Sequence, residues 1–343
     1  MNARAGMQGD SDPVEEESGD GSLLRLVAEL YYRRDWGQVQ IGEVLGCSAS
    51  KVSRLLAAAR AQGIVQITIE PDPGALRPLA RQLSEALGLE ATITPGRAGD
   101  PIAAGRMCAV AAAPLIATEL PVEGVIGIAG GHTISAMVNA LPSVERSGLT
   151  VVPIVGSYHV TESFLDVNEI AGNLARQLHA TAQRILAPGL LDSAATRRVL
   201  LADSAVRATT AFWSHLDYVL VGVSGAPGYR PGYPTVMEQL SEDGLRRLEG
   251  KGVAGEVAGH LFGFDGTLVE DEWTSRALSI PFELLRASKQ VAGVAAGSSK
   301  VNSLIACSRT GVLDRLFTDE PTARAILQVL QDGGYPGLAS GGG

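Results

Sequence analysis

Residues 38–63, QVQIGEVLGCSASKVSRLLAAARAQG, predict two short helices joined by a tight turn. The first helix runs to Leu45, Gly46 makes the turn, and Ser48 caps the second helix with its hydroxyl oxygen. This arrangement is typical of a helix-turn-helix, in which the second helix enters the major groove of DNA. The segment therefore indicates a DNA-binding head.

Apolar residues at helical spacing connect these two helices to a third helix that precedes them. We expect the three helices to share one core made of Leu26, Val27, Leu30, Ile41, Val44, Leu45, Val52, Leu55 and Leu56. Tyr31 and Trp36 are interpreted as packing residues, and Cys47 as a small space-filling residue rather than a thiol sensor. Residues 21–70 therefore form the expected helix-turn-helix domain, which ends in an alternating strand at 64–69.

The outer face of the second helix is predicted to be polar and basic. Residues 48–62 contain Lys51, Arg54 and Arg60 and no acidic residue. Lys and Arg can donate hydrogen bonds to guanine or to phosphate, and Ser can bond to either. The expected DNA contacts are Gln38, Ser48, Ser50, Lys51, Ser53 and Arg54. Two alternatives remain open: the basic face is only solvated, or it contacts another protein.

The composition is that of a globular chain with an acidic total charge. Its 343 residues carry 28 Lys and Arg against 37 Asp and Glu, a formal charge of −9, and 45% of them are hydrophobic. This length accommodates about two domains. Residues 1–20 hold six acids and one arginine, which predicts a disordered tail, and a second tail is expected at 336–343. The acidic total does not exclude DNA binding, because residues 21–70 carry a net positive charge.

Cysteine usage and the N-terminal segment exclude several classes of protein. Cys47, Cys108 and Cys307 are far apart, with no paired spacing and no clustered histidine. A disulfide scaffold and a structural zinc site are therefore not expected, and we predict neither metal nor cofactor. No signal peptide and no uncharged stretch of membrane-spanning length is recognised, so a cytoplasmic location without membrane contact is predicted.

The rest of the chain predicts a linker helix and a large α/β domain. Leu76, Leu79, Leu83 and Leu87 indicate a helix within a linker at 71–90, which stops at Gly88. Over residues 91–335, Ala-rich helical windows alternate with short β-branched runs: ATIT at 91–94, VIGIA at 125–129, TVVPIV at 150–155, YVLVGV at 218–223 and QVAGVAA at 290–296. This alternation favours a mostly parallel sheet covered by helices, with ligands bound beyond the carboxyl ends of the strands.

Further motifs follow the head in a fixed order: GVIGIAGGHT at 124–133, VVPIVGS at 151–157, VNEIAGNLARQL at 167–178, LDYVLVGVSG at 216–225 and AAGSSKVNSLIA at 295–306. With these motifs, nearly the whole chain after residue 21 resembles the SorC family of bacterial sugar-responsive transcriptional regulators. The resemblance implies an effector domain related in fold to phosphosugar isomerases. It also implies a sugar or phosphorylated sugar as effector, and a homodimer or homotetramer on double-stranded operator DNA.

Two glycine-containing turns are the predicted effector contacts. Residues 130–133 and 297–300 each follow a strand and open a helix, where backbone amides favour an anion. Lys300 adds a positive charge that can pair with phosphate. The resemblance implies effector contacts by Gly131, His132, Thr133, Asn168, Asp265, Ser299 and Lys300.

Three positions depart from the family pattern. Gly130, His132 and Gly263 stand where an aromatic residue, an arginine and an acid are frequent. These departures leave open whether the effector is phosphorylated.

The leading functional hypothesis is a transcriptional regulator, specifically a repressor, that is controlled by a small molecule. The alternative is an isomerase-like enzyme in which Asp265 or Lys300 acts as acid, base or nucleophile. The head favours the regulator, because an isomerase has no need of a recognition helix.

Overall fold

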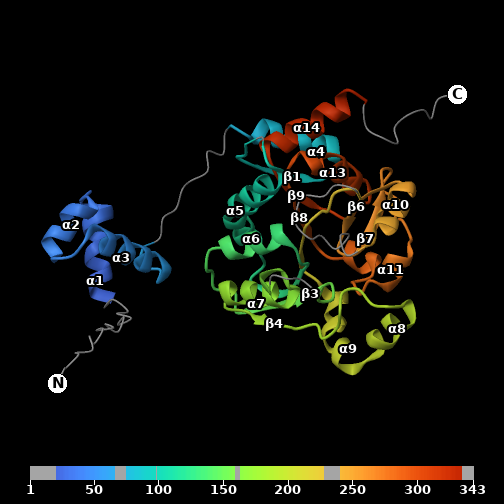
Figure 1. Cartoon of the computed structure of the whole chain (residues 1–343), viewed down its shortest axis with the longest axis horizontal. Helices are drawn as coiled ribbons and strands as arrows, with labels where there is room; N and C mark the ends of the chain where they lie inside the picture. Colours follow the sequence, from blue (N-terminus) through green and yellow to red (C-terminus); the bar gives the residue numbers. More distant parts are fainter. Residues whose placement is uncertain (1–20, 66–74, 98, 159–162, 228–239, 334–343) are drawn as a thin grey trace, which may run out of the picture. The chain divides into compact units, whose positions relative to one another are not determined.

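The computed structural model describes residues 21–65, 75–97, 99–158, 163–227 and 240–333 (Figure 1). The two expected tails, and positions 66–69 of the expected strand, lie outside these residues. Ile64 and Val65 are described and are not part of a strand. The chain divides into two compact units, Met1–Asp72 and Pro73–Gly343.

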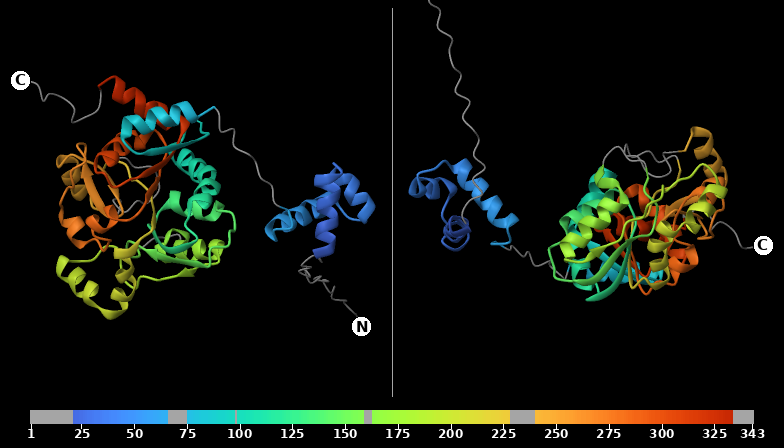
Figure 2. Two further views of the ribbon diagram at one scale, coloured as in Figure 1. Left: turned by 180° about the vertical axis from the view of Figure 1, so that it is seen from behind. Right: turned by 90° about the horizontal axis from the view of Figure 1, so that it is seen from below.

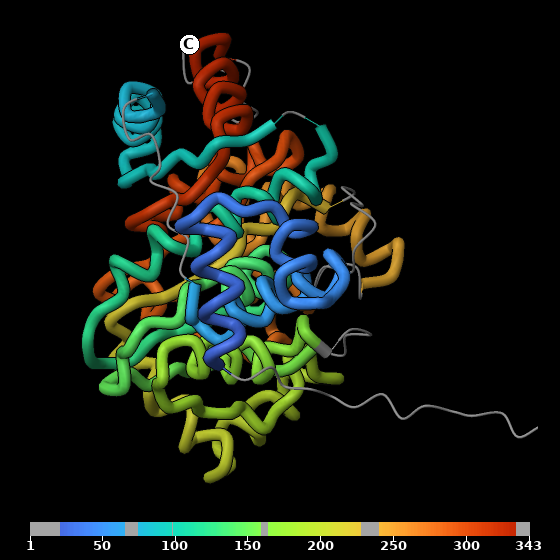
Figure 3. Tube along the Cα trace, turned by 90° about the vertical axis from the view of Figure 1, so that its left-hand side faces the viewer, coloured from blue at the N-terminus to red at the C-terminus, as the bar shows by residue number. Residues whose placement is uncertain are grey.

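The small unit is a three-helix head whose trace can be followed in Figure 3. Its elements are α1 (Gly21–Ala28), the π-helical turn η1 (Glu29–Arg33), α2 (Gln38–Leu45) and α3 (Ala49–Ala61). Val27, Ile41, Val52 and Leu56 form the centre of the core, and Tyr31 and Trp36 pack against it as predicted. Cys47 is partly buried against the same cluster, which agrees with a packing role.

Two predicted core residues of the head are exposed. Leu26 is 45% exposed and Val44 is 63% exposed, so both predictions are wrong. On α1 the buried positions are Leu24, Val27 and Ala28, a spacing of three and four residues that points Leu26 outward. The helical period was recognised correctly, but the face of each helix that turns inward depends on how the three helices pack.

The turn between α2 and α3 depends on two glycines. Gly46 has a φ of 66°, a left-handed conformation that glycine adopts without steric cost. Gly42, inside α2, lies so close to the turn that a Cβ atom there would stand 2.5 Å from the carbonyl oxygen of Cys47. Ser48 then caps α3 by accepting a hydrogen bond of 3.2 Å from the backbone amide of Lys51.

The large unit contains a parallel sheet of seven strands in the order β1-β9-β8-β5-β2-β3-β4 (Figure 1). The strands are β1 (Glu90–Thr94), β2 (Glu123–Ile128), β3 (Gly148–Pro153), β4 (Thr181–Ala182), β5 (Tyr218–Val221), β8 (Val291–Val294) and β9 (Arg315–Asp319). All five strands predicted for the large domain are present, and the α/β fold with a parallel sheet is confirmed. The sequence reading missed β4, β9 and a separate antiparallel hairpin, β6 (Val253–Val257) and β7 (His260–Gly263).

Helices cover both faces of this sheet (Figure 2). They are α4 (Arg77–Leu87), α5 (Pro101–Glu119), α6 (His132–Ala140), α7 (Val167–Leu178), α8 (Ala194–Ala202), α9 (Ser204–Thr210), α10 (Glu242–Gly250), α11 (Glu272–Arg276), α12 (Phe282–Arg286), α13 (Val301–Arg309) and α14 (Glu320–Gln331). Short helical turns η2 (Ser163–Leu165), η3 (Ala211–His215) and η5 (Ser298–Lys300) complete the unit.

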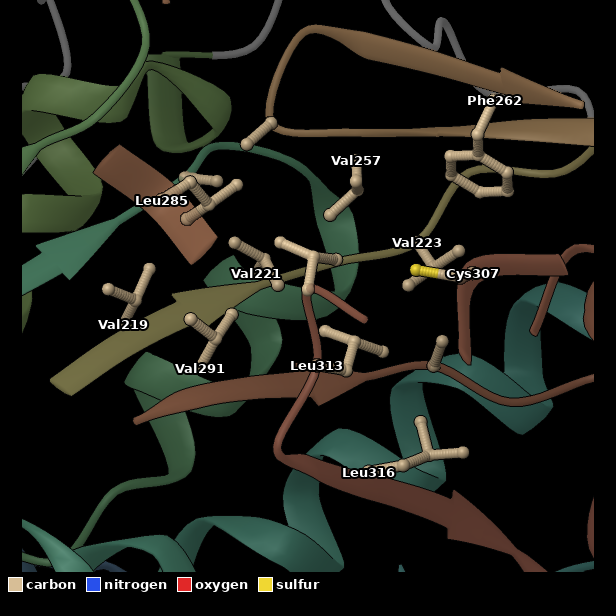
Figure 4. Packing of buried hydrophobic residues seen from close by; sticks show 14 of the residues in the cluster. Val219, Val221, Val223, Val257, Phe262, Leu285, Val291, Cys307, Leu313 and Leu316 are labelled. Carbon is tan, nitrogen blue, oxygen red and sulfur yellow. The ribbon is translucent and has the colours of Figure 1, made fainter. Parts of the chain in front are cut away.

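Two hydrophobic cores lie on opposite faces of the sheet. Val219 and Val221 of β5 belong to the core that includes α4, α13 and the β6–β7 hairpin, whereas Leu220 belongs to the core with α5, α6 and α7. Figure 4 shows Val219, Val221 and Val291 on neighbouring strands of the first core. Strands buried on both faces carry unbroken apolar runs, which explains why the sequence predicted them.

The helix expected in the linker belongs to the large unit. Leu79, Leu83 and Leu87 of α4 are buried in its core, and α4 packs against α14 and β1 (Figures 1 and 2). This corrects the prediction of a linker helix at 71–90. A leucine repeat indicates a buried helical face, but it does not identify the surface that covers it.

Among the described residues, one helix, α5 (Pro101–Glu119), is long and apolar enough to cross a membrane by length and composition alone. Cys108, Ala112 and Ile116 on its inner face are fully buried in the core. The packing of α5 against α6 and the sheet accounts for its apolar character.

Candidate functional site

The predicted recognition surface lies on the first turns of α3. Ser48, Ser50, Lys51, Ser53 and Arg54 are all exposed, while Val52 and Leu56 of the same helix are buried. Gln38, the first residue of α2, is only partly buried. Helix α3 carries no acidic residue, so its exposed face is basic. A buried apolar face and an exposed polar face are what a helix needs to lie in a DNA groove.

The two glycine turns lie at the carboxyl edge of the sheet in the large unit. Gly131 follows β2 and begins α6, and Gly297 follows β8 and begins η5 and α13. Both have a φ of 111°, a conformation that side-chain-bearing residues rarely adopt. A Cβ atom on Gly105 of α5 would lie 3.5 Å from Thr133 Oγ1 and 3.7 Å from the carbonyl oxygen of Ala296. The two turns therefore meet against α5.

Lys300, at the end of the second turn, lies near enough to the buried carboxyl group of Glu256 for the two charges to interact. Glu256, at the tip of the β6–β7 hairpin, accepts a hydrogen bond of 2.6 Å from the amide of Gly259 and one from the hydroxyl of Ser224. Burial raises the pKa of the Glu256 carboxyl, and the charge of Lys300 opposes this rise. Burial also lowers the pKa of Lys300 to about 8, against the pull of Glu256.

Two buried hydroxyl groups, one near Glu256 and one on the residue before Lys300, have no hydrogen-bond partner among the described residues. They are Tyr158 Oη and Ser299 Oγ, and both atoms are buried. Burial and the nearby charge of Glu256 raise the pKa of Tyr158, so its hydroxyl stays protonated. A buried hydroxyl without a partner costs free energy that a bound polar ligand can recover. We call Lys300, Glu256, Ser224, Tyr158 and Ser299 the Lys300 cluster.

The cluster is assembled from distant parts of the chain. Tyr158 follows β3, Ser224 follows β5, Glu256 lies on the hairpin, and Ser299 and Lys300 follow β8. Neither Glu256 nor Tyr158 was among the predicted contacts. The sequence indication for Glu256 was a single acid inside the apolar run VAGEVAG. A buried charge is costly unless it is paired or hydrogen-bonded, so an acid in such a run is expected to have a specific partner.

Asn168, a predicted effector contact, is hydrogen-bonded to the backbone of a neighbouring segment. Its side-chain amide donates to the carbonyl oxygen of Ile185 at 3.3 Å and accepts from the amide of Ile185 at 2.8 Å. The side chain is buried and joins α7 to the segment after β4. Asn168 therefore supplies hydrogen-bond partners to the backbone amide and carbonyl of Ile185.

Asp265 is also placed away from the Lys300 cluster. It is exposed at the far end of β7, where its carboxylate accepts hydrogen bonds from the amide and hydroxyl of Thr267 at 3.0 and 2.7 Å. These bonds lower the pKa of Asp265 and stabilise a turn. Glu256, at the opposite end of the same hairpin, is the acidic residue beside Lys300.

His132 is partly buried at the start of α6, with its ring 6.4 Å from that of Phe164 in an edge-on contact. Thr133 is partly buried beside it. In the part of the chain that the structure describes, no group of His, Cys, Asp and Glu side chains is arranged to hold a metal ion. The Lys300 cluster offers hydroxyls, one ammonium and one carboxyl, which suit a polar organic ligand.

Comparison with known proteins identifies relatives of both units. Residues 73–328 match the family model described as "Putative sugar-binding domain". The sorbitol operon regulator of Klebsiella pneumoniae is 29% identical over 320 residues, which cover 91% of this chain and all of that protein. The erythritol catabolism regulatory protein EryD of Brucella abortus is 29% identical over 314 residues, covering 90% of this chain and 97% of that protein.

The structural comparison agrees with the sequence comparison. The crystal structure of the full-length sorbitol operon regulator SorC from Klebsiella pneumoniae has a TM-score of 0.68 at 27% identity. The match covers 90% of this chain and 99% of that chain.

A helix-turn-helix head followed by an α/β domain with a polar cluster at its carboxyl edge defines a class of transcriptional regulators with sugar-binding domains. The chain belongs to this sugar-binding domain family and is a member of the SorC group of regulators. The isomerase-like enzyme considered above is not supported, because the relatives that match nearly the full chain are regulators.

Proposed function

We propose that this protein is a repressor that binds a pseudo-palindromic operator through α3 and leaves it when a sugar or phosphorylated sugar binds at the Lys300 cluster. The observation that carries the proposal is a basic, exposed helix and a buried cluster of unsatisfied polar groups on the same chain. The names of two relatives refer to sorbitol and erythritol, which supports an effector rich in hydroxyl groups. Such a regulator acts on DNA in the cytoplasm.

The effector site in this proposal comprises Lys300 and Ser299 with Glu256, Tyr158 and Ser224, and it extends to the turn of Gly131, His132 and Thr133. The contact of both glycine turns with α5 supports the inclusion of that turn. Thr133 Oγ1 and the amides at the start of α6 supply further hydrogen bonds. Asn168 and Asp265 are left out, because their side chains already have structural partners.

The DNA contacts in this proposal are Ser50, Lys51, Ser53 and Arg54 on α3, with Ser48 and Gln38 at the helix starts. Replacing Arg54 with alanine should weaken specific binding by roughly 1 to 3 kcal/mol and relax discrimination at one base pair in each half-site. Arg60→Ala is the matched control, since Arg60 is exposed on the last turn of the same helix. Fluorescence anisotropy on a selected operator measures both variants, and equal affinity of Arg54→Ala and wild type would remove α3 from the interface.

We further propose that the functional unit is a homodimer or homotetramer held together by the large unit. One helix-turn-helix reads only a few base pairs, and paired half-sites supply the rest. Met107 and Val110 on α5 are 51% and 53% exposed, and apolar side chains of this kind suit an association surface.

A fragment that begins at Pro73 should therefore still associate in analytical ultracentrifugation. This start point keeps α4, which covers the core of the large unit. Association of the full chain but not of the fragment would move the main contact to the head. A monomeric full chain at micromolar concentration would contradict the proposed assembly.

The direct test of the proposed function measures operator binding in a titration with candidate effectors. Full-length protein is first used to select its site from random duplex DNA, and each candidate sugar or sugar phosphate is then added to the complex. The proposal expects release of the DNA by at least one of them. A protein that selects no DNA sequence would contradict it.

A further inference from the structure

The second glycine turn is hydrogen-bonded to the last helix of the large unit. The backbone amide of Gly297 donates to Thr322 Oγ1, on the first turn of α14, at 2.7 Å. This bond is buried, and Thr322 is only 2% exposed. A buried amide that loses its acceptor costs free energy. A movement of the turn is therefore expected to carry the start of α14 with it.

The start of α14 is also fixed to the edge of the sheet. Asp319, the last residue of β9, is 1% exposed and accepts a hydrogen bond of 3.0 Å from the amide of Thr322. It lies beside Thr94 of the neighbouring strand β1. A Cβ atom on Gly96, which follows β1, would stand 2.6 Å from Asp319 Cβ. The glycine turn, the cap of α14 and the end of β1 therefore form one closely packed group.

Helix α14 covers α4 on the same face of the sheet (Figures 1 and 2). Ala323 and Ile326 of α14 and Leu79 and Leu83 of α4 are buried in one hydrophobic core. Protein interiors are close-packed, so a shift of one helix in such a core is transmitted to the helix that packs against it. A displacement of α14 is therefore expected to displace α4.

Helix α4 lies where the chain from the head enters the large unit. The small unit ends at Asp72 and the large unit begins at Pro73, so α4 is the first helix after the head. Within the large unit, Ser84 Oγ of α4 accepts a hydrogen bond of 2.9 Å from the amide of Ala91 in β1. A change in the position of α4 therefore changes the point to which the head is tethered.

We infer that Thr322 is the positioning residue that couples the glycine turn at 297–300 to the head, because its hydroxyl joins this turn to α14 and α14 packs against α4. This inference rests on the proposed function and adds the route by which effector and operator influence each other. Thr322 acts without touching either ligand, through packed elements of the fold. Coupling between two ligands is reciprocal, so operator DNA bound to the head should alter the turn.

Amide hydrogen exchange followed by mass spectrometry tests the inference on the full chain, alone and bound to its selected operator duplex. In wild type, the operator should change the exchange rates of segments 295–300 and 320–331 by about twofold or more. Thr322→Val keeps the shape of the side chain and removes the hydroxyl. It should reduce the operator-induced change at 295–300 by about two- to tenfold, the effect of one hydrogen bond on an equilibrium. Thr322→Ser keeps the hydroxyl and should restore the change.

Thr209→Val is the matched control. Thr209 is 2% exposed on α9 and donates to the carbonyl oxygen of Arg184 at 2.6 Å, so the control removes a comparable buried hydroxyl from another helix of the large unit. It should respond to the operator as wild type does.

The outcomes distinguish this inference from the proposed function. An operator response of equal size in Thr322→Val and wild type would overturn the inference. An unchanged segment 295–300 in wild type bound to a selected operator would also overturn it, and this measurement does not depend on the folding of any variant. Either result would leave operator binding intact, whereas a protein that selects no DNA sequence would contradict the proposed function and the inference together.

Discussion

Replacing Lys300 with alanine is expected to reduce effector affinity by roughly 1.5 to 3 kcal/mol, the scale of a hydrogen bond to a charged group. The ammonium is partly buried beside Glu256, and no described residue accepts a hydrogen bond from it. The variant removes the donor and leaves Glu256 as an uncompensated buried acid. The operator complex should therefore no longer respond to concentrations of effector that release wild-type protein.

The same variant should bind operator DNA without effector as wild type does, because Lys300 lies in the large unit and α3 in the small one. Arg286→Ala is the control, since Arg286 is exposed on α12 in the same unit. Calorimetry measures the effector and a gel-shift assay measures the DNA. Equal effector affinity in Lys300→Ala and wild type would mean that Lys300 is only a lysine at a helix start.

Replacing Gly42 with valine is expected to weaken specific DNA binding strongly without affecting the large unit. Even the Cβ atom would stand 2.5 Å from the carbonyl oxygen of Cys47, and the obstacle is backbone rather than a movable side chain. Overpacking of this kind lowers the free energy of unfolding by about 1 to 3 kcal/mol or more. Replacing a helical glycine regains at most roughly 1 kcal/mol through better helix propensity, so the substitution is destabilising. The turn that positions α3 must open, so operator affinity should fall roughly ten- to hundredfold.

Gly37→Ala provides the control, because a Cβ atom at Gly37 would have no neighbour within 4 Å. Anisotropy on the selected operator should show unchanged affinity for this control. Calorimetry should show normal effector binding in both variants, since the large unit folds as a separate compact unit. Wild-type operator affinity in Gly42→Val would contradict the account of the turn.

The local features of the fold could be predicted from the sequence because each has a local cause. The turn needed a glycine at 46, and the cap needed a side-chain oxygen at 48. The run YVLVGV reads as a strand because β5 is buried on both faces. The β6–β7 hairpin was missed because glycines and a histidine interrupt its apolar pattern, so neither the strand period nor a helical one is clear.

The candidate site was only partly predictable. The turn at 297–300 has a local signature, and its lysine lies in the cluster. Glu256 and Tyr158 join it through contacts between residues far apart in the chain, which no local pattern records. Asn168 and Asp265 have residue types suited to a sugar, but nearby backbone groups use their hydrogen bonds. A polar residue type indicates what a side chain can bind, and only the fold determines which partner it meets.

The central claim is that a small molecule bound in the large unit changes the affinity of the head for DNA. The most direct measurement is an anisotropy titration of the full chain on its selected operator, with and without the effector that binds best in calorimetry. We predict that saturating effector weakens operator binding by about tenfold or more in wild type and leaves Lys300→Ala unchanged. Operator affinity that stays constant in wild type while calorimetry records bound effector would contradict the claim.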